Sequence, residues 1–287
     1  MPDRRTGWCF MPHDAFLSAT DWLFGTLAVL AILLYGVAVF YSNRQRRLRK
    51  WPYKRSVLWI AGVLASVSAV VGPLAELSHA HFAWHMLGHL LLGMLGPLLL
   101  ALAAPMTLAL RTLPVRQARK VSHLLKSRLA GFYTHPVIAS ILNIGGLWLL
   151  YTTGLFAAMH HHLWLHIVIH IHVFVAGYLF TISLLYIDPV SRRYSFRYRT
   201  TVFIVALAGH GILSKLLYAY PPAGVPIEEA RAGAMLMYYG GDAVDLVIII
   251  LLFSSWYHST KRQHNHVTST PTSQAYANET IQNAPAS

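Results

Sequence analysis

Charged residues are scarce in this chain, because Asp, Glu, Lys and Arg together make up only 11% of its 287 residues. Soluble globular domains usually carry about 25% of these residues. Apolar residues, in contrast, make up 55% of the chain. This composition excludes an ordinary soluble domain and predicts a membrane protein.

Cysteine is nearly absent, and Cys9 is the single thiol. One cysteine excludes an intrachain disulfide and gives little support to a metal site built on thiolates. Acidic residues are also few, with 10 Asp and Glu against 23 Lys and Arg, and the formal net charge is +13. A charge of this size also occurs in nucleic-acid-binding proteins, so its distribution along the chain decides its meaning.

Seven apolar segments are long enough to cross a bilayer, which takes about 20 residues in a helix. The chain is therefore predicted to be all-α, a polytopic membrane protein whose residues 22–258 form a bundle of seven transmembrane helices. Pro97 and Pro105 fall in the third and longest segment, so we expect them to kink it or to end it early. The expected spans are Trp22–Tyr41, Val57–Leu77, Phe82–Leu110, Pro136–Met159, Leu163–Ile187, Thr201–Ala219 and Ala234–Trp256.

The loops after spans one, three and five carry most of the basic residues, and the other loops are nearly free of them. Basic loops stay on the cytoplasmic side, which predicts an outer N-terminal segment (1–21) and a cytoplasmic C-terminus. The polar residues 259–287 are expected to form a disordered cytoplasmic tail. The positive charge thus reports topology in a lipid bilayer, and no nucleic-acid partner is predicted. The basic residues are Arg44, Arg46, Arg47, Arg49, Lys50, Lys54, Arg55, then Arg111, Arg116, Arg119, Lys120, Lys126, Arg128, then Arg192, Arg193, Arg197 and Arg199.

Histidines recur at intervals of four residues in two apolar segments. On an α-helix, residues four apart lie on one face, about 6 Å apart along the axis. Each triplet therefore forms a stripe of imidazole rings. Ionisable groups are costly in a bilayer unless they are paired, bound to an ion or in a cavity, so the stripes predict a metal site. The triplets are His81, His85 and His89, and His162, His166 and His170.

The two stripes are expected to face each other, because spans three and five run in the same direction and their histidines match in depth. His210 in span six and Asp242 in span seven lie at a similar depth. Imidazole and carboxylate ligands suit copper or zinc. The predicted metal ligands are His85, His89, His166, His170, His210 and Asp242, and the predicted access ligands at the outer ends are His79, His81, His160, His161 and His162.

Some of these residues also fit structural roles. A single buried histidine such as His210 often forms a hydrogen bond between membrane helices. Asp242 can pair with Lys215 of span six. Thioether sulfur prefers monovalent copper, but methionine is also a common core filler. The methionines near the outer side are Met86, Met159, Met235 and Met237.

Three spans carry motifs that are specific in combination. They are His85-Met-Leu-Gly-His89 with Pro97-Leu-Leu-Leu and Ala104-Pro105, then His166 and His170 with Phe174, Gly177, Leu179-Phe180 and Asp188-Pro189, then Gly233-Ala-Met-Leu-Met237-Tyr-Tyr-Gly-Gly-Asp242. Together they resemble the multi-spanning CtaG family, whose members are assembly factors of cytochrome c oxidase. The resemblance covers roughly residues 20–258.

The resemblance implies a protein of the bacterial plasma membrane that helps to mature a haem–copper oxidase, with copper as the metal handled and zinc as the alternative. Its expected partner is an oxidase subunit, a soluble copper chaperone or both. The family pattern carries over onto His85, His89, His166, His170 and Asp242. The chain departs from it at Glu229-Ala-Arg231-Ala-Gly233-Ala234, where a run of an acid, two glutamines and paired glycines is expected.

Three functions remain open from the sequence. The favoured one is an assembly factor that binds copper and passes it on without turnover. The second is an intramembrane metal hydrolase, in which three histidines and an aspartate hold zinc and activated water. The third is a b-type haem protein with His89 and His170 as axial ligands, since the chain lacks a Cys-x-x-Cys-His motif for covalent haem.

Overall fold

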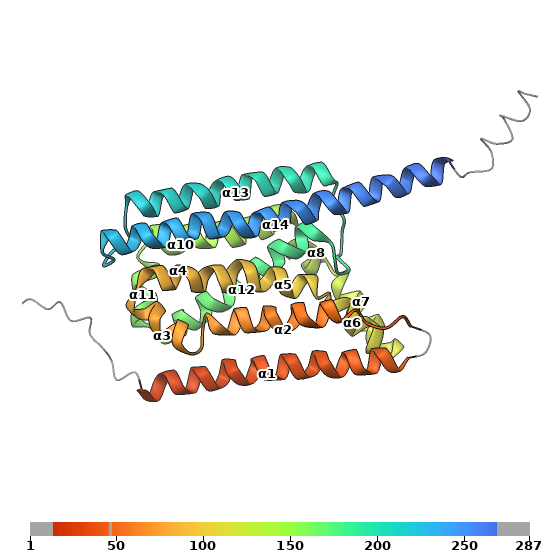
Figure 1. The fold of residues 1–287 in the computed structure, drawn as a ribbon, viewed down its shortest axis with the longest axis horizontal. Helices are drawn as coiled ribbons and strands as arrows, with labels where there is room; N and C mark the ends of the chain where they lie inside the picture. Colours follow the sequence, from red (N-terminus) through yellow and green to blue (C-terminus); the bar gives the residue numbers. More distant parts are fainter. Residues whose placement is uncertain (1–13, 46–47, 269–287) are drawn as a thin grey trace, which may run out of the picture. The chain divides into compact units, whose positions relative to one another are not determined.

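The computed structural model describes residues 14–45 and 48–268, with side chains described for 21–45 and 48–261, and this part of the chain is helical without strands (Figure 1). The all-α prediction is therefore confirmed. The helices are α1 (Asp14–Arg44), α2 (Tyr53–Ser68), α3 (Pro73–Ala80), α4 (Phe82–Leu90), α5 (Gly96–Leu102), α6 (Pro105–Thr112), α7 (Val115–Leu125), α8 (Arg128–Tyr133), α9 (Pro136–Ser140), α10 (Gly146–Thr152), α11 (Leu155–His161), α12 (Leu163–Leu185), α13 (Phe196–Ala219) and α14 (Ile227–Thr268), with π-helical turns η1 (Leu91–Leu95) and η2 (Ile141–Gly145).

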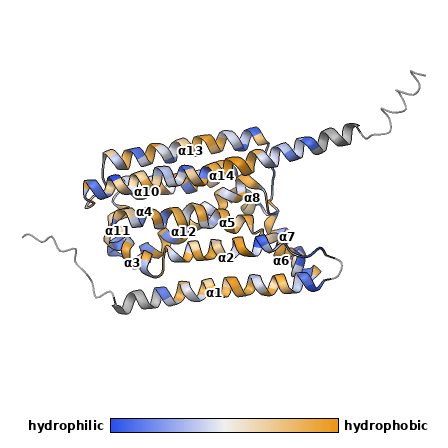
Figure 2. Ribbon diagram, viewed as in Figure 1, coloured by the Kyte–Doolittle hydropathy of each residue, from blue (hydrophilic) through white to orange (hydrophobic). Residues whose placement is uncertain are grey.

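Six helical segments are long and apolar enough to cross a membrane, and Figure 2 shows apolar residues along most of their length. The chain is thus a multi-pass membrane protein. A further pair of helices passes the same test only when its two bent parts are taken together. The six segments are Asp21–Arg44, Tyr53–Ala80, Phe82–Thr112, Leu163–Leu185, Phe196–Ala219 and Ile227–Lys261.

The segment predicted as a single fourth span is broken. Pro136–Thr152 and Leu155–His161 meet at an angle of 78°. Thr153 has an extended backbone (φ −115°, ψ 178°), and Gly154 follows it as the residue that starts the next helix. The apolar pattern continues through this bend, so hydropathy predicted one continuous helix where the backbone forms two.

The third span is interrupted where its prolines predicted a kink or an early end. The π-helical turn η1 precedes Pro97, and α5 ends at Leu102. Ala104 then takes a left-handed conformation (φ 55°, ψ 56°), and Pro105 opens α6 as its first residue. Proline lacks the N–H that continues a helix and fits the first helical turn, so Pro105 fixes the start of α6.

Three predicted boundaries differ from the structure. The predicted second span ends at Leu77, but α3 continues to Ala80 and carries His79, and it begins after Gly72 turns the chain with φ 86°. The described part of α1 extends back to Asp14, past the predicted span start at residue 22. The helix α14 continues to Thr268, past the predicted tail boundary at 258, and residues 269–287 lie outside the described residues, as does Cys9.

The chain divides into two units, Met1–Asp245 and Leu246–Ser287, and α14 crosses the boundary between them. In the first unit, η1 and α12 approach closely where Gly93 and Gly177 meet, because a side-chain carbon on Gly177 would fall on the Gly93 carbonyl. Gly233 and Gly240 bring the first turns of α14 against Phe82, Met86 and Leu90 of α4. Small residues allow membrane helices to pack this closely.

Histidines and basic residues lie at opposite ends of the first unit. The short helices α3 and α11 and the starts of α4 and α12 gather at one end, and α6, α7 and α8 gather at the other (Figure 1). The first group carries the predicted outer histidines, and the second carries Arg111, Arg116, Arg119 and Lys120.

Candidate metal centre

Five histidines from four helices form a continuous group of rings, which we call the outer histidine cluster. His79 of α3 stacks on His166 of α12 with a centroid distance of 5.5 Å, and His166 stacks on His170 at 4.1 Å. His160 of α11 lies 6.4 Å from His79 and 6.3 Å from His85 of α4, measured between ring centroids. His79 and His160, two of the predicted access ligands, thus connect His85 of one predicted stripe to His166 and His170 of the other.

A cavity lies next to this cluster, and we call it the outer cavity. The space open to the centre of a water molecule is about 20 Å³, which is room for about one water molecule or ion. Its polar wall includes three of the predicted ligands, one from α12 and two from α4. The lining residues are Ala69, Ser78, His85, Gly88, His89, Leu92, Leu150, Tyr151, Met159, Ile169, His170 and Val173.

Hydrogen bonds to backbone carbonyls orient two rings of the cluster. The Nδ1 of His170 lies 2.8 Å from the carbonyl oxygen of His166, and the Nδ1 of His160 lies 2.9 Å from that of Phe156. A carbonyl oxygen only accepts, so both Nδ1 atoms donate and both Nε2 atoms keep a free lone pair. Metal-binding histidines commonly show this arrangement, in which the second ring nitrogen donates to a carbonyl.

Tyr151 of α10 is a site residue that sequence reasoning missed. Its hydroxyl lies 3.1 Å from the Nε2 of His85, and its ring is buried beside Phe82 and Phe156. A hydrogen bond at Nε2 leaves the Nδ1 of His85 as the nitrogen available to a metal. A single tyrosine in an apolar segment shows no periodicity, so no pattern in the sequence predicts this contact.

A second cavity, which we call the deep cavity, also adjoins His89. It is smaller, at about 10 Å³, and His89 lines both cavities. His210 of α13 and Asp245 of α14 line the deep cavity only. The full lining is His89, Met94, Asn143, Ile144, Leu147, Phe180, Phe203, Ala206, Leu207, His210 and Asp245.

The Nε2 atoms of His89 and His210 are both buried without a hydrogen-bond partner. The two side chains are 7% and 3% exposed. An unpaired buried nitrogen costs about 1–3 kcal/mol, so a ligand that satisfies both atoms would recover part of that energy.

Within residues 21–45 and 48–261, no three His, Cys, Asp or Glu side chains are set to hold one metal ion. The rings of His166 and His170 are stacked, with centroids 4.1 Å apart and ring planes 25° apart. The donors fit copper or zinc in kind, and side-chain rotation about the outer cavity would be needed to bring them onto one ion.

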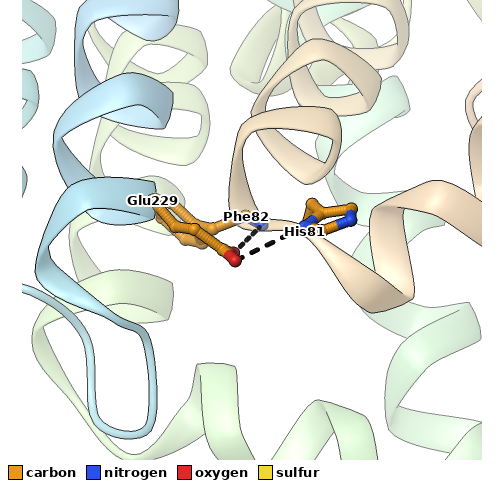
Figure 3. Close-up of polar contacts among 3 residues, drawn as sticks. All are labelled: His81, Phe82 and Glu229. Atoms are coloured by element: carbon orange, nitrogen blue, oxygen red, sulfur yellow. Dashed lines mark hydrogen bonds and ion pairs between the residues drawn. The ribbon is translucent and has the colours of Figure 1, made fainter.

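His81 and Glu229 are in contact at the start of α4, outside the outer cavity (Figure 3). The His81 Nδ1 lies 3.4 Å from one carboxylate oxygen of Glu229, and the backbone N–H of Phe82 donates to the other at 3.2 Å. Glu229 thus caps the start of α4 from α14. It lies in the stretch where the sequence departs from the family pattern.

Three other predicted residues lie apart from both cavities. His161 and His162 are exposed at the end of α11 and before α12. Asp242 is exposed on α14, whereas Asp245, three residues further on, is 4% exposed and lines the deep cavity. The ammonium group of Lys215 lies 5.5 Å from the ring centroid of Tyr238. Among the described side chains no ion pair joins Lys215 to Asp242.

Comparison with known proteins gives one family. A family model described as cytochrome c oxidase caa3 assembly factor (Caa3_CtaG) matches residues 33–259. Uncharacterized proteins of Mycobacterium bovis and Mycobacterium tuberculosis are each 29% identical to this chain over 266 residues, which cover 85% of the chain and 40% of the relative. An uncharacterized protein of Mycobacterium leprae is 26% identical over 278 residues, which cover 88% and 42%. The chain therefore spans about two fifths of the length of these curated relatives. No solved structure matches the chain.

Proposed function

The chain belongs to the family of cytochrome c oxidase caa3 assembly factors, and we propose that it serves oxidase assembly by binding copper and passing it on. The single observation that carries the copper proposal is the outer histidine cluster beside a cavity of ion size. Copper is the cargo in this proposal, and the protein acts without catalysis. Zinc is the alternative metal, because imidazole ligands suit both.

We further propose seven spans in a bacterial plasma membrane, with the bent pair of helices counted as the fourth. The N-terminus then lies outside and the C-terminus in the cytoplasm, because the basic loops mark the cytoplasmic side. In this orientation the outer histidine cluster faces the outside of the cell. A donor of copper to an acceptor on that side needs its exchangeable ligands there.

In the proposed site, His160 and His170 each offer an Nε2 atom, because the Nδ1 atom of the same ring already donates to a carbonyl. His85 and His166 supply further nitrogens, and His79 connects the cluster to the surface. Such neutral imidazoles can release copper one ligand at a time, whereas a closed tetrahedral site holds its metal. The receiving partner is an oxidase subunit, and a soluble copper chaperone is proposed as the source.

The two alternative functions have less support. The outer and deep cavities, at about 20 and 10 Å³, have no room for a haem as the side chains lie. A metal hydrolase needs a general base near its metal-bound water. Among the described residues, the buried carboxylate that lines a cavity together with histidines is Asp245, and it lines the deep cavity and not the outer cavity.

A deletion strain tests the proposal in the cell. We expect it to make the oxidase polypeptides but to show reduced oxidase activity, with a copper centre depleted of metal. Growth in medium without added copper is required, because excess copper can bypass a delivery factor. Normal oxidase activity and copper content under these conditions would overturn the proposal.

Two histidines on α12 provide a matched pair for complementation of that strain. His170 lines the outer cavity, whereas His172, two residues away, donates from Nε2 to the Leu142 carbonyl on η2. We expect His170→Ala to leave the oxidase depleted of copper and His172→Ala to restore it, at equal protein levels in the membrane. Equal restoration by both variants would remove His170 from the site.

A further inference from the structure

The deep cavity carries a donor set that differs from that of the outer cavity. It combines two imidazoles, one thioether and one carboxylate, from His89, His210, Met94 and Asp245. These four residues come from α4, η1, α13 and α14, so the site exists only when the first unit is folded. The remaining walls are mostly apolar, with Phe180 and Phe203 among them.

We propose that the deep cavity is a second copper site, specific for the monovalent ion, held by His89, His210 and Met94 and charge-balanced by Asp245. The proposal rests on copper being the cargo of the outer histidine cluster. It adds a separate position that adjoins the first, because His89 lines both cavities.

The unpaired nitrogens point to a ligand in this place. The Nε2 atoms of His89 and His210 are buried without partners, and both rings line the same cavity. One ion bound in this cavity would give both nitrogens a partner. The cavity volume of about 10 Å³ is at the lower limit for one water molecule, which favours a bare ion of low coordination number over a hydrated one.

Charge and ligand softness select the monovalent ion. Neutral imidazoles and a thioether carry no charge, so one carboxylate on Asp245 neutralises one positive charge. A divalent ion would keep a net positive charge in an apolar region, which is costly. Thioether sulfur also favours monovalent copper. Met94 is thus the residue that distinguishes this site from a zinc site.

The absence of a side chain at Gly241 leaves space for the ring of His210. A side-chain carbon on Gly241 of α14 would lie 2.5 Å from the Cε1 of His210. Glycine is therefore needed there for the ring to hold its position. Gly241→Ala displaces the ring without removing any donor atom, which makes it a second and independent way to disrupt the deep site.

The test is an anaerobic titration of the purified full chain with monovalent copper against a competing chelator. We expect two copper ions per chain for the wild type and for Ser214→Ala, a control whose hydroxyl only donates to the His210 carbonyl. We expect one ion per chain for Met94→Leu, His210→Ala and Gly241→Ala, with the affected ion bound at least tenfold more weakly. Met94→Leu conserves volume, so loss of the fold does not confound it.

X-ray absorption identifies the ligands of the deep ion. In His85→Ala combined with His170→Ala, the remaining copper is expected to show a sulfur neighbour that disappears in Met94→Leu. Two ions in all three deep-site variants would overturn the inference. One ion in the wild type, lost in His170→Ala but kept in His210→Ala and Met94→Leu, would overturn the inference and leave the proposed function intact. A wild type that binds no copper would overturn both.

Discussion

A hydrogen bond on one ring nitrogen of a histidine decides which nitrogen remains for a metal. In the outer histidine cluster, His160 and His170 donate from Nδ1 to carbonyls of their own helices, which frees Nε2. His85 is the exception, because its Nε2 faces the Tyr151 hydroxyl. The cluster therefore offers two kinds of nitrogen to one cavity. The position of His85 depends on Tyr151, which lies 66 residues further along the chain.

Tyr151→Phe tests this dependence. The substitution removes only the hydroxyl and keeps the buried ring, so we expect the fold to persist. Loss of a group that orients a metal ligand typically costs 10–100-fold in affinity, and we expect copper binding at the outer cavity to weaken by about that factor. Tyr238→Phe, on α14 and outside both cavities, is the control. Unchanged copper affinity in Tyr151→Phe would show that Tyr151 only packs against the site.

The histidines of the site could be predicted from the sequence because they recur with the period of an α-helix. Intervals of four residues placed His85 and His89 opposite His170, and these three do line one cavity. The contributions of Tyr151, Met94 and Asn143 depend instead on how helices rotate against each other. For the same reason, Asp242 was predicted as a metal ligand from its depth in the membrane alone. The rotation of α14 instead buries Asp245 and exposes Asp242.

At the scale of elements, the broken third span is stabilised by the segment that follows α12. The N–H groups of Met106 and Thr107, which a helix start leaves unpaired, donate to the two carboxylate oxygens of Asp188 at 3.0 and 2.8 Å. The Thr107 hydroxyl donates to the same carboxylate at 2.6 Å. This contact joins two motifs that are far apart in the sequence, Ala104-Pro105 and Asp188-Pro189. The sequence shows both motifs but does not show that they are in contact.

Asp188→Ala should therefore destabilise the protein. Asp188 is buried, and its removal leaves the N–H groups at the start of α6 without an acceptor, which costs about 1–3 kcal/mol. We expect a lower thermal unfolding temperature in detergent and faster proteolysis between α5 and α7. Thr107→Ser keeps the hydroxyl and serves as the matched control. Wild-type stability of Asp188→Ala would mean that water replaces the carboxylate at no cost.

The crossing of η1 and α12 leads to a second prediction at this scale. A methyl group on Gly177 has no space, because it would fall on the Gly93 carbonyl, so Gly177→Ala forces the two helices apart. Overpacking of this kind costs about 1–3 kcal/mol or more. We expect reduced thermal stability together with loss of copper binding, since His89 and His170 lie on the displaced helices. Gly36→Ala, where no atom lies within 4 Å of the added carbon, should behave as the wild type.

At the scale of the whole molecule, the ends of the first unit differ in chemistry. One end carries the outer histidine cluster, and the other carries α7, whose basic side chains Arg116, Arg119 and Lys120 are exposed. Basic residues are retained on the cytoplasmic side of a membrane, and a metal cargo collected outside has to meet its ligands on the opposite side. The orientation of the bundle in the membrane therefore decides from which side the metal reaches the outer histidine cluster.

The scarcity of cysteine makes this orientation directly measurable. In a Cys9→Ser background, a single cysteine can be introduced at an exposed position on either end, as in His161→Cys or Lys120→Cys. We expect a membrane-impermeant thiol reagent to label His161→Cys in intact cells and Lys120→Cys only after the cells are permeabilised. The reverse labelling would place the outer histidine cluster on the cytoplasmic side. Copper would then have to reach it from the cytoplasm, and delivery to an acceptor outside the membrane would no longer follow from its position.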